Sequence, residues 1–300
     1  MVSKSGFAGI YPMVYAIFDS AGRLSADATR LQVKAMLRHK VHGIGVLGLA
    51  SETNKLTLAE RHELMERVAE AAGGSVPLAV TISEPNVAAA TAFARAAATA
   101  GAHWVILQPP PVRGLPEAEL VRFFGAVADV CPLPVGIQNA PEYLGIGLSS
   151  EGLIALVRAH PNVVIAKVEA SGLAIDRLNA ILEGSVDIFN GRGGIDMIDA
   201  LRAGAVGIIP GAECFDVLRS IFDDLSAPGG DADRAAQRYA AILPLLVFLM
   251  ESMDTFIVYG KEVLRCRLGL GEIHQRLPAS PATPFGLYSA RRYAAALGPL

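Results

Sequence analysis

Charged residues are scarce in this 300-residue sequence, in which Asp, Glu, Lys and Arg together make up 18% against 52% hydrophobic residues. A formal net charge of −3, without a basic run, gives no electrostatic reason to expect a nucleic acid as partner. Cysteine is also rare: Cys131, Cys214 and Cys266 lie far apart and lack the spacing of zinc ligands. We interpret them as reduced, mostly buried residues of a cytoplasmic protein.

The sequence also lacks a long apolar run. The most apolar late stretch, 242–250, contains Pro244 and is followed by Glu251 and Asp254, so it is too short to span a bilayer and indicates a buried helix. The N-terminus has no apolar segment typical of a signal peptide. We therefore expect a soluble, intracellular protein without a membrane partner.

What the sequence does contain is a regular alternation of short apolar runs with Ala-rich amphipathic segments. Most runs are continuously apolar, which is typical of parallel strands covered on both faces. We expect eight strands, at 9–15, 43–47, 77–81, 104–107, 134–138, 163–167, 187–190 and 206–209. Helices are expected between them, at 25–39, 57–72, 86–100, 116–130, 149–158, 173–182 and 195–202, with another after Gly211.

This alternation predicts an α/β fold, the (β/α)8 TIM barrel, because eight strand–helix units in about 220 residues match it in length and count. An open doubly wound sheet also alternates strands and helices, but no GxGxxG motif follows the first strand. A polar linker begins at Ser226 and leads to helical stretches near 232–253, 255–268 and 284–297. We expect a catalytic barrel domain over 1–225 and a three-helix C-terminal domain over 226–300.

The sixth predicted strand ends in VVIAKVEASG, where Lys167 closes an apolar run. In a barrel the active site lies at the C-terminal ends of the strands, and a buried lysine can attack a ketone as the neutral amine. The alternative is that Lys167 extends from the strand into water. Glu169 shares the strand face with Lys167 if strand geometry persists, and could take a substrate proton or pair with the lysine. Otherwise Glu169 turns into the loop and is solvated.

Small or polar residues also close the second and fifth strands. Ser51 and Glu52 follow the second strand in a turn whose N–H groups would suit a substrate carboxylate. Gln138 and Asn139 could each orient a substrate oxygen or merely cap the loop backbone. No histidine lies at the strand ends and no cluster has the spacing of metal ligands, so we expect no metal and no cofactor.

Taken together, the motifs resemble the dihydrodipicolinate synthase / N-acetylneuraminate lyase family from about Gly9 to the C-terminus. The resemblance is carried by GVLGLASET with its following LTLAE, by IAKVEASG, by GRGG and by AGAVGIIPG. It implies the barrel, the helical C-terminal domain, a Schiff-base lysine at Lys167, a small-molecule 2-keto acid substrate and usually a homo-tetramer of two dimers. It also implies substrate-binding roles for Ala50, Ser51, Asn139, Tyr143, Gly191 and Ile209.

Departures from the family pattern discriminate between reactions. Gln138 replaces the family's catalytic tyrosine, Tyr143 replaces an arginine, and both hydroxyls of the family's Thr/Ser pair are missing before Ser51. The tyrosine pair after the fourth strand is Pro110-Pro111. An amide cannot relay a proton, so aldol cleavage and dihydrodipicolinate synthesis are disfavoured. The IQNAP and KVE segments are similar to those of the 2-keto-3-deoxy-sugar-acid dehydratase branch, L-2-keto-3-deoxyarabonate dehydratase among them.

We therefore expect a Schiff-base lyase that dehydrates a 2-keto-3-deoxy sugar acid. Lys167 would form the iminium, Glu169 would remove a C3 proton, and Gln138 would orient the substrate while the enamine expels the C4 hydroxyl. One alternative is a pyruvate-releasing aldolase or a dihydrodipicolinate-synthase-like condensing enzyme, with water or Tyr143 in place of the missing phenol. Another is a non-catalytic keto-acid-binding homologue, which has no need of the nucleophile at Lys167.

Overall fold

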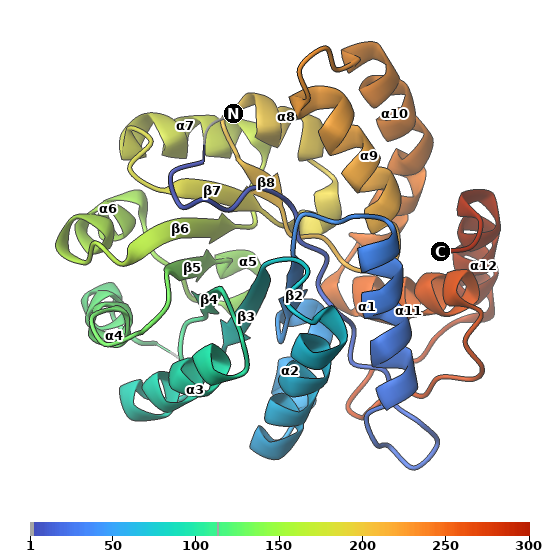
Figure 1. The fold of residues 1–300 in the computed structure, drawn as a ribbon, viewed down its shortest axis with the longest axis horizontal. Helices are drawn as coiled ribbons and strands as arrows, with labels where there is room; N and C mark the ends of the chain where they lie inside the picture. Colours follow the sequence, from blue (N-terminus) through green and yellow to red (C-terminus); the bar gives the residue numbers. More distant parts are fainter. Residues whose placement is uncertain (1–2, 113) are drawn as a thin grey trace. The chain divides into compact units, whose positions relative to one another are not determined.

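The structure, a computed structural model, describes residues 3–112 and 114–300. Within these residues eight strands form one sheet in the order β1-β8-β7-β6-β5-β4-β3-β2 (Figure 1). The strands are β1 (Gly9–Ile10), β2 (Ile44–Val46), β3 (Leu78–Ile82), β4 (Trp104–Leu107), β5 (Val135–Asn139), β6 (Val163–Val168), β7 (Asp187–Asn190) and β8 (Gly207–Ile208). Helices alternate with the strands and three more follow near the C-terminus, which confirms the (β/α)8 barrel with C-terminal helices.

The helices lie close to the expected segments, and Ser, Thr or Asn side chains cap the N-termini of several of them. Their bounds are α1 (Ala26–Arg38), α2 (Leu58–Ala72), α3 (Val87–Thr99), α4 (Glu117–Ala128), α5 (Pro141–Leu144), α6 (Ser150–Ala159), α7 (Gly172–Leu182), α8 (Met197–Arg202), α9 (Phe215–Ser226), α10 (Ala232–Leu249), α11 (Met253–Leu268) and α12 (Pro284–Leu297). None of the helices in the described part of the chain is long and apolar enough to cross a membrane.

Some boundaries differ from the expectation. The first strand is regular only over Gly9–Ile10, and beyond it Met13 makes isolated parallel bridges to Gly45 and Gly211. Helix α10 ends at Leu249, about one turn before its expected end, because Ser252 caps the start of α11. The short helix α5 was not expected at all. It begins at Pro141, a residue suited to a first helical turn.

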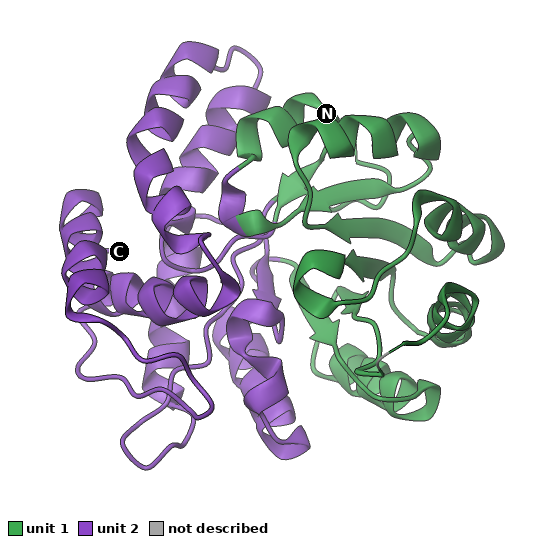
Figure 2. Ribbon diagram, turned by 180° about the vertical axis from the view of Figure 1, so that it is seen from behind, with its two compact units in different colours: residues 1–9, 77–192, 196–208 green, residues 10–76, 193–195, 209–300 purple. Residues whose placement is uncertain are grey.

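The chain divides into two compact units, which Figure 2 colours separately. Unit 1 comprises residues 1–9, 77–192 and 196–208, and it contains β3 to β8. Unit 2 comprises residues 10–76, 193–195 and 209–300, and it contains α1, β2 and α2 together with α9 to α12. The C-terminal helices therefore share a unit with the early part of the chain, while the domain boundary at 225/226 stays a prediction.

In unit 1 the strands β3 to β8 pair in parallel, each with the next in sequence. Their residues are buried almost throughout, as continuously apolar strands require. The ring of Trp104 lies 5.5 Å from that of Phe189 and 5.7 Å from that of Phe7, centroid to centroid. This aromatic cluster includes Phe189, the residue that pairs with Lys167 in the neighbouring strand.

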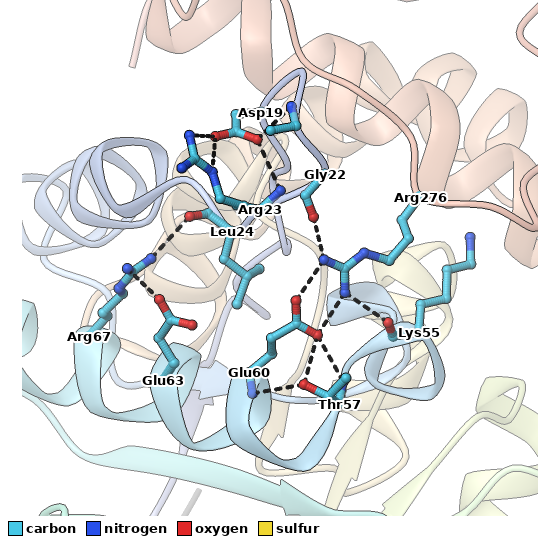
Figure 3. A network of polar contacts seen from close by, with 11 residues as sticks. Asp19, Gly22, Arg23, Leu24, Lys55, Thr57, Glu60, Glu63, Arg67 and Arg276 are labelled. Atoms are coloured by element: carbon cyan, nitrogen blue, oxygen red, sulfur yellow. Dashed lines mark hydrogen bonds and ion pairs between the residues drawn. The ribbon is translucent and has the colours of Figure 1, made fainter.

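In unit 2, a network of charged groups fastens the segment after α11 to the start of α2 (Figure 3). The Arg276 guanidinium binds both carboxylate oxygens of Glu60, at 2.7 and 2.8 Å, and the carbonyl oxygens of Lys55 and Gly22. Glu60 also completes a capping box with Thr57. The bonds from Arg276 lower the pKa of Glu60 from 4.5 to about 2.

Replacing Glu60 by glutamine is expected to lower the free energy of unfolding by about 1–2 kcal/mol at pH 7, because the charge-assisted bonds to Arg276 weaken while the capping geometry survives. Since the folded-state pKa is depressed, Glu60 stabilises the fold above about pH 4.5, and this contribution is lost as the pH falls towards 2. Urea unfolding at pH 7 and pH 3 measures the difference. The control Glu63→Gln, which alters an exposed pair with Arg67, should cost less than about 0.5 kcal/mol.

Candidate active site

Lys167 lies inside β6, one residue before its end. It pairs with Gln138 of β5 on one side and with Phe189 of β7 on the other. Paired residues of parallel strands project on the same face, so Lys167 and Gln138 lie side by side. Only 6% of the Lys167 side chain is exposed, which rules out the alternative of a lysine extended into water.

Glu169 follows β6 and keeps the strand geometry, since its N–H donates to the carbonyl oxygen of Asn139 at 3.2 Å. Its carboxylate accepts hydrogen bonds from Lys167 Nζ, from the main-chain N–H of Arg192 and, at 3.2 Å, from Gln138 Nε2. The side chain is 6% exposed and is not solvated in a loop. The structure thus brings Lys167, Glu169 and Gln138 together, the three residues expected to carry the chemistry.

Gly191 lies beside this carboxylate at the end of β7. Its N–H donates to the carbonyl oxygen of Val168 at 2.8 Å, which extends the pairing of β6 and β7 by one step. A Cβ atom at this position would overlap both carboxylate oxygens of Glu169. The glycine is therefore required by the close approach of Glu169.

Tyr143, on α5, is half-buried. Burial raises the pKa of Tyr143, and the negative charge of Glu169 raises it further, while the positive charge of Arg192 opposes these effects. The Arg192 guanidinium also pairs with Asp196 at 3.1 Å. The Tyr143 phenol consequently keeps its proton at neutral pH.

Asn139 fastens the loop that follows β5. Its amide donates to the carbonyl oxygen of Leu148 and accepts from the Leu148 N–H, both at 2.9 Å. The side-chain amide thus satisfies the loop backbone, which is the capping role that the sequence left open. A substrate contact of Asn139 stays a prediction.

The remaining predicted residues, Ala50, Ser51 and Ile209, belong to unit 2 and are buried. The Ser51 hydroxyl donates to the carbonyl oxygen of Val14 at 2.6 Å and accepts from the Leu47 N–H at 3.0 Å. The Ser51 N–H itself donates to the Gly48 carbonyl. Ser51 therefore holds the shape of its own turn, and the substrate-binding roles of the three residues stay predictions.

Two buried ionisable pairs in unit 2 have no counterpart in the predicted site. Glu52 binds Lys261 of α11, and Tyr15 donates to Glu213 Oε2 at 2.7 Å. Burial raises the pKa of Tyr15 and of Glu213, and it lowers that of Lys261. Glu52 stands in the GLASE motif, but nothing in the sequence marks a lysine 209 residues later as its partner.

Gln108 is a further polar residue at a strand end, and it was not among the predicted site residues. It directly follows β4 and is buried, and its Nε2 atom has no hydrogen-bond partner among residues 3–112 and 114–300. Leu107 pairs with Ile137, so Gln108 comes level with Gln138 in the neighbouring strand. In the sequence, only its position directly before the proline turn marks Gln108 as a candidate site residue. In the same described residues no group of His, Cys, Asp or Glu is arranged to hold a metal ion.

The chain matches the model of the dihydrodipicolinate synthetase family over residues 6–287. It is 30% identical over 263 residues to an L-2-keto-3-deoxyarabonate dehydratase of Azospirillum brasilense, covering 86% of this chain and 84% of that protein. It is 28% identical over 278 residues to a 4-hydroxy-tetrahydrodipicolinate synthase of Methanosphaerula palustris, covering 91% of this chain and 93% of that protein.

Solved structures agree on the fold. A dihydrodipicolinate synthase from Rhodopseudomonas palustris superposes with a TM-score of 0.87 at 24% identity, covering 99% of each chain. A Ruminococcus gnavus sialic acid aldolase superposes with a TM-score of 0.86 at 20% identity, covering 97% of this chain and 98% of that one. The family match extends over nearly the whole sequence. The chain therefore belongs to the dihydrodipicolinate synthetase family of Schiff-base lyases.

Proposed function

We propose that this protein is a Schiff-base dehydratase of a 2-keto-3-deoxy sugar acid, with Lys167 as the nucleophile and Glu169 as the base. Lys167 Nζ adds to the C2 carbonyl, and loss of water gives the iminium. Glu169 takes a proton from C3, and the electrons of the C3–H bond form the enamine. The C4–O bond then breaks, and the hydroxyl leaves as water with the proton held by Glu169, which gives a C3=C4 double bond. In a pentonate, loss of a C5 proton and gain of a proton at C3 convert this product into an enol, which becomes the C5 aldehyde, and hydrolysis of the iminium frees Lys167 and the keto-aldehyde.

The observation that carries this proposal is the contact of the Glu169 carboxylate with Lys167 Nζ. A carboxylate next to the iminium nitrogen is within reach of C3, only two bonds away along the substrate. The same carboxylate can serve as base and then as acid, so dehydration needs no further proton relay. The 30% identity to a dehydratase of this substrate class agrees with the proposal.

Aldol cleavage needs a second base, which the residues next to Lys167 do not supply. A base must remove the proton of the C4 hydroxyl, and the strand position next to Lys167 holds the amide of Gln138. Tyr143 is the phenol that could replace the missing tyrosine, but its raised pKa makes the phenol harder to deprotonate at neutral pH, so it relays the hydroxyl proton less readily. Dehydration is therefore favoured. We also propose a homo-tetramer of two dimers, on the family likeness alone.

Glu169→Gln is expected to lower dehydration at least about 100-fold, because the amide cannot accept the C3 proton, while the Lys167 adduct still forms. The enzyme is incubated with a 2-keto-3-deoxy pentonate, and the products are separated. A keto-aldehyde that retains every carbon identifies dehydration, whereas pyruvate identifies an aldolase. Borohydride reduction and mass spectrometry measure the adduct on Lys167.

The matched control is Glu151→Gln, an exposed glutamate in the first turn of α6, which should keep wild-type turnover. Full turnover of Glu169→Gln would remove the base assignment. No adduct with any 2-keto acid in the wild-type protein would reject the Schiff-base mechanism as a whole.

A further inference from the structure

The Glu169 carboxylate is held at both oxygens by groups with different roles. Oε1 faces the chemistry, since it accepts from Lys167 Nζ and from Gln138 Nε2. Oε2 accepts from the main-chain N–H of Arg192, a group that takes no part in the reaction. A carboxylate anchored through one oxygen holds its other oxygen in a fixed direction. The base is therefore already oriented for proton transfer when the substrate binds.

The segment that anchors Oε2 follows β7 immediately. The N–H of Gly191 bonds to Val168 and so fixes this segment to β6, the strand that carries Lys167. Arg192 then adopts a left-handed conformation, with φ of 49°, which is uncommon for a residue with a side chain. Strained residues of this kind cluster at functional sites, and here the conformation accompanies the N–H bond to Glu169.

The space for the carboxylate comes from Gly191. This glycine is not among the residues with positive φ, so its backbone conformation is open to alanine. The methyl group of an alanine would nevertheless overlap Oε1, Oε2 and Cδ of Glu169. The requirement for glycine thus comes from the carboxylate, not from the turn.

From these contacts we propose that Gly191 and Arg192 form a positioning element for the base: Gly191 leaves the space and the Arg192 N–H supplies the anchor that keep Oε1 of Glu169 on Lys167. The inference rests on the proposed roles of Lys167 and Glu169. It assigns the control of proton transfer at C3 to Gly191 and Arg192, the two residues that follow β7. Schiff-base formation at Lys167 does not depend on them.

The test uses pyruvate, the smallest 2-keto acid, with the intact protein in D2O. Exchange of the methyl protons, followed by NMR, reports proton transfer at C3, and borohydride trapping reports the Lys167 imine. Gly191→Ala is expected to lower the exchange rate about 100-fold, because the methyl group displaces the carboxylate, while trapping stays within about threefold of wild type. Gly271→Ala is the control, since its Cβ meets no atom within 4 Å, and both rates should match wild type.

A second variant separates positioning from general damage to the fold. Glu169→Asp withdraws the carboxylate by one methylene and should slow exchange about tenfold by itself. Combined with Gly191→Ala, the shorter side chain makes room for the new methyl group, so the double variant should exchange at least about tenfold faster than the two separate effects predict.

Three results would each overturn the positioning role. The first is a wild-type exchange rate in Gly191→Ala, and the second is an equal loss of trapping and exchange in that variant. The third is a double variant in which the effects of the two substitutions on exchange are independent. Failure of the wild-type protein to give any adduct would instead reject the proposed function and leave Gly191 without a reaction to serve.

Discussion

Replacing Lys167 by methionine is expected to lower turnover at least about 1000-fold, because methionine fills the space without a nucleophilic amine. Every step of the proposed reaction passes through the bond between Nζ and C2 of the substrate. The adduct seen after borohydride reduction should disappear at the same time. Initial rates with the 2-keto-3-deoxy acid and intact-protein mass spectrometry measure the two effects.

The chain offers a matched control in a second buried lysine. Lys261→Met removes an amine that is as buried as Lys167 but is paired with Glu52 in unit 2. Assayed below its unfolding temperature, this variant should still give one adduct per chain with a 2-keto acid. An adduct that persists in Lys167→Met, or that maps to Lys261, would contradict the assignment of the nucleophile.

Lys261→Met is also expected to have the largest effect on stability, lowering the free energy of unfolding by about 3–5 kcal/mol. The side chains of Lys261 and Glu52 are 1% and 0% exposed, so removal of the cation leaves a buried carboxylate. Lys55, whose Nζ lies 2.6 Å from Glu52 Oε1, compensates only in part, since it is more exposed. Urea unfolding followed by circular dichroism measures the loss.

A double-mutant cycle isolates the pair from its surroundings. Glu52→Gln removes the charge that Lys261 faces, and the double variant Glu52→Gln/Lys261→Met carries neither buried charge. We expect the double variant to be at least about 1 kcal/mol more stable than the sum of the single effects predicts. Strict additivity would show that the two side chains do not stabilise each other.

Much of the site around Lys167 could be predicted from the sequence, because it depends on local order. The apolar run ending at Lys167 predicts a buried strand, and the spacing of two places Glu169 on the same face. Parallel pairing then brings Gln138 alongside without any knowledge of side-chain contacts. The eight strands were predictable for the same reason, since each is defined by its own few residues.

The rest depends on contacts between distant segments, which local patterns do not encode. The left-handed conformation of Arg192 accompanies its bond to Glu169, and the space at Gly191 is taken by the Glu169 carboxylate. The GRGG motif alone indicates neither. The amide of Asn139 binds the loop backbone at Leu148, a contact that no local pattern of the sequence indicates. The strand expected over 9–15 is regular only over Gly9–Ile10, and beyond it Met13 makes isolated bridges to Gly45 and Gly211.

The make-up of unit 2 has a consequence for the order of folding during synthesis. Its residues 10–76 leave the ribosome long before residues 209–300, and Lys261 is made 209 residues after Glu52. Until α11 has been synthesised, the Glu52 carboxylate lacks the partner with which the folded unit buries it, so it must stay hydrated. Unit 2 therefore cannot be completed until residues 209–300 have been made, and a nascent chain that stops before α11 would be an incompletely folded species prone to aggregation.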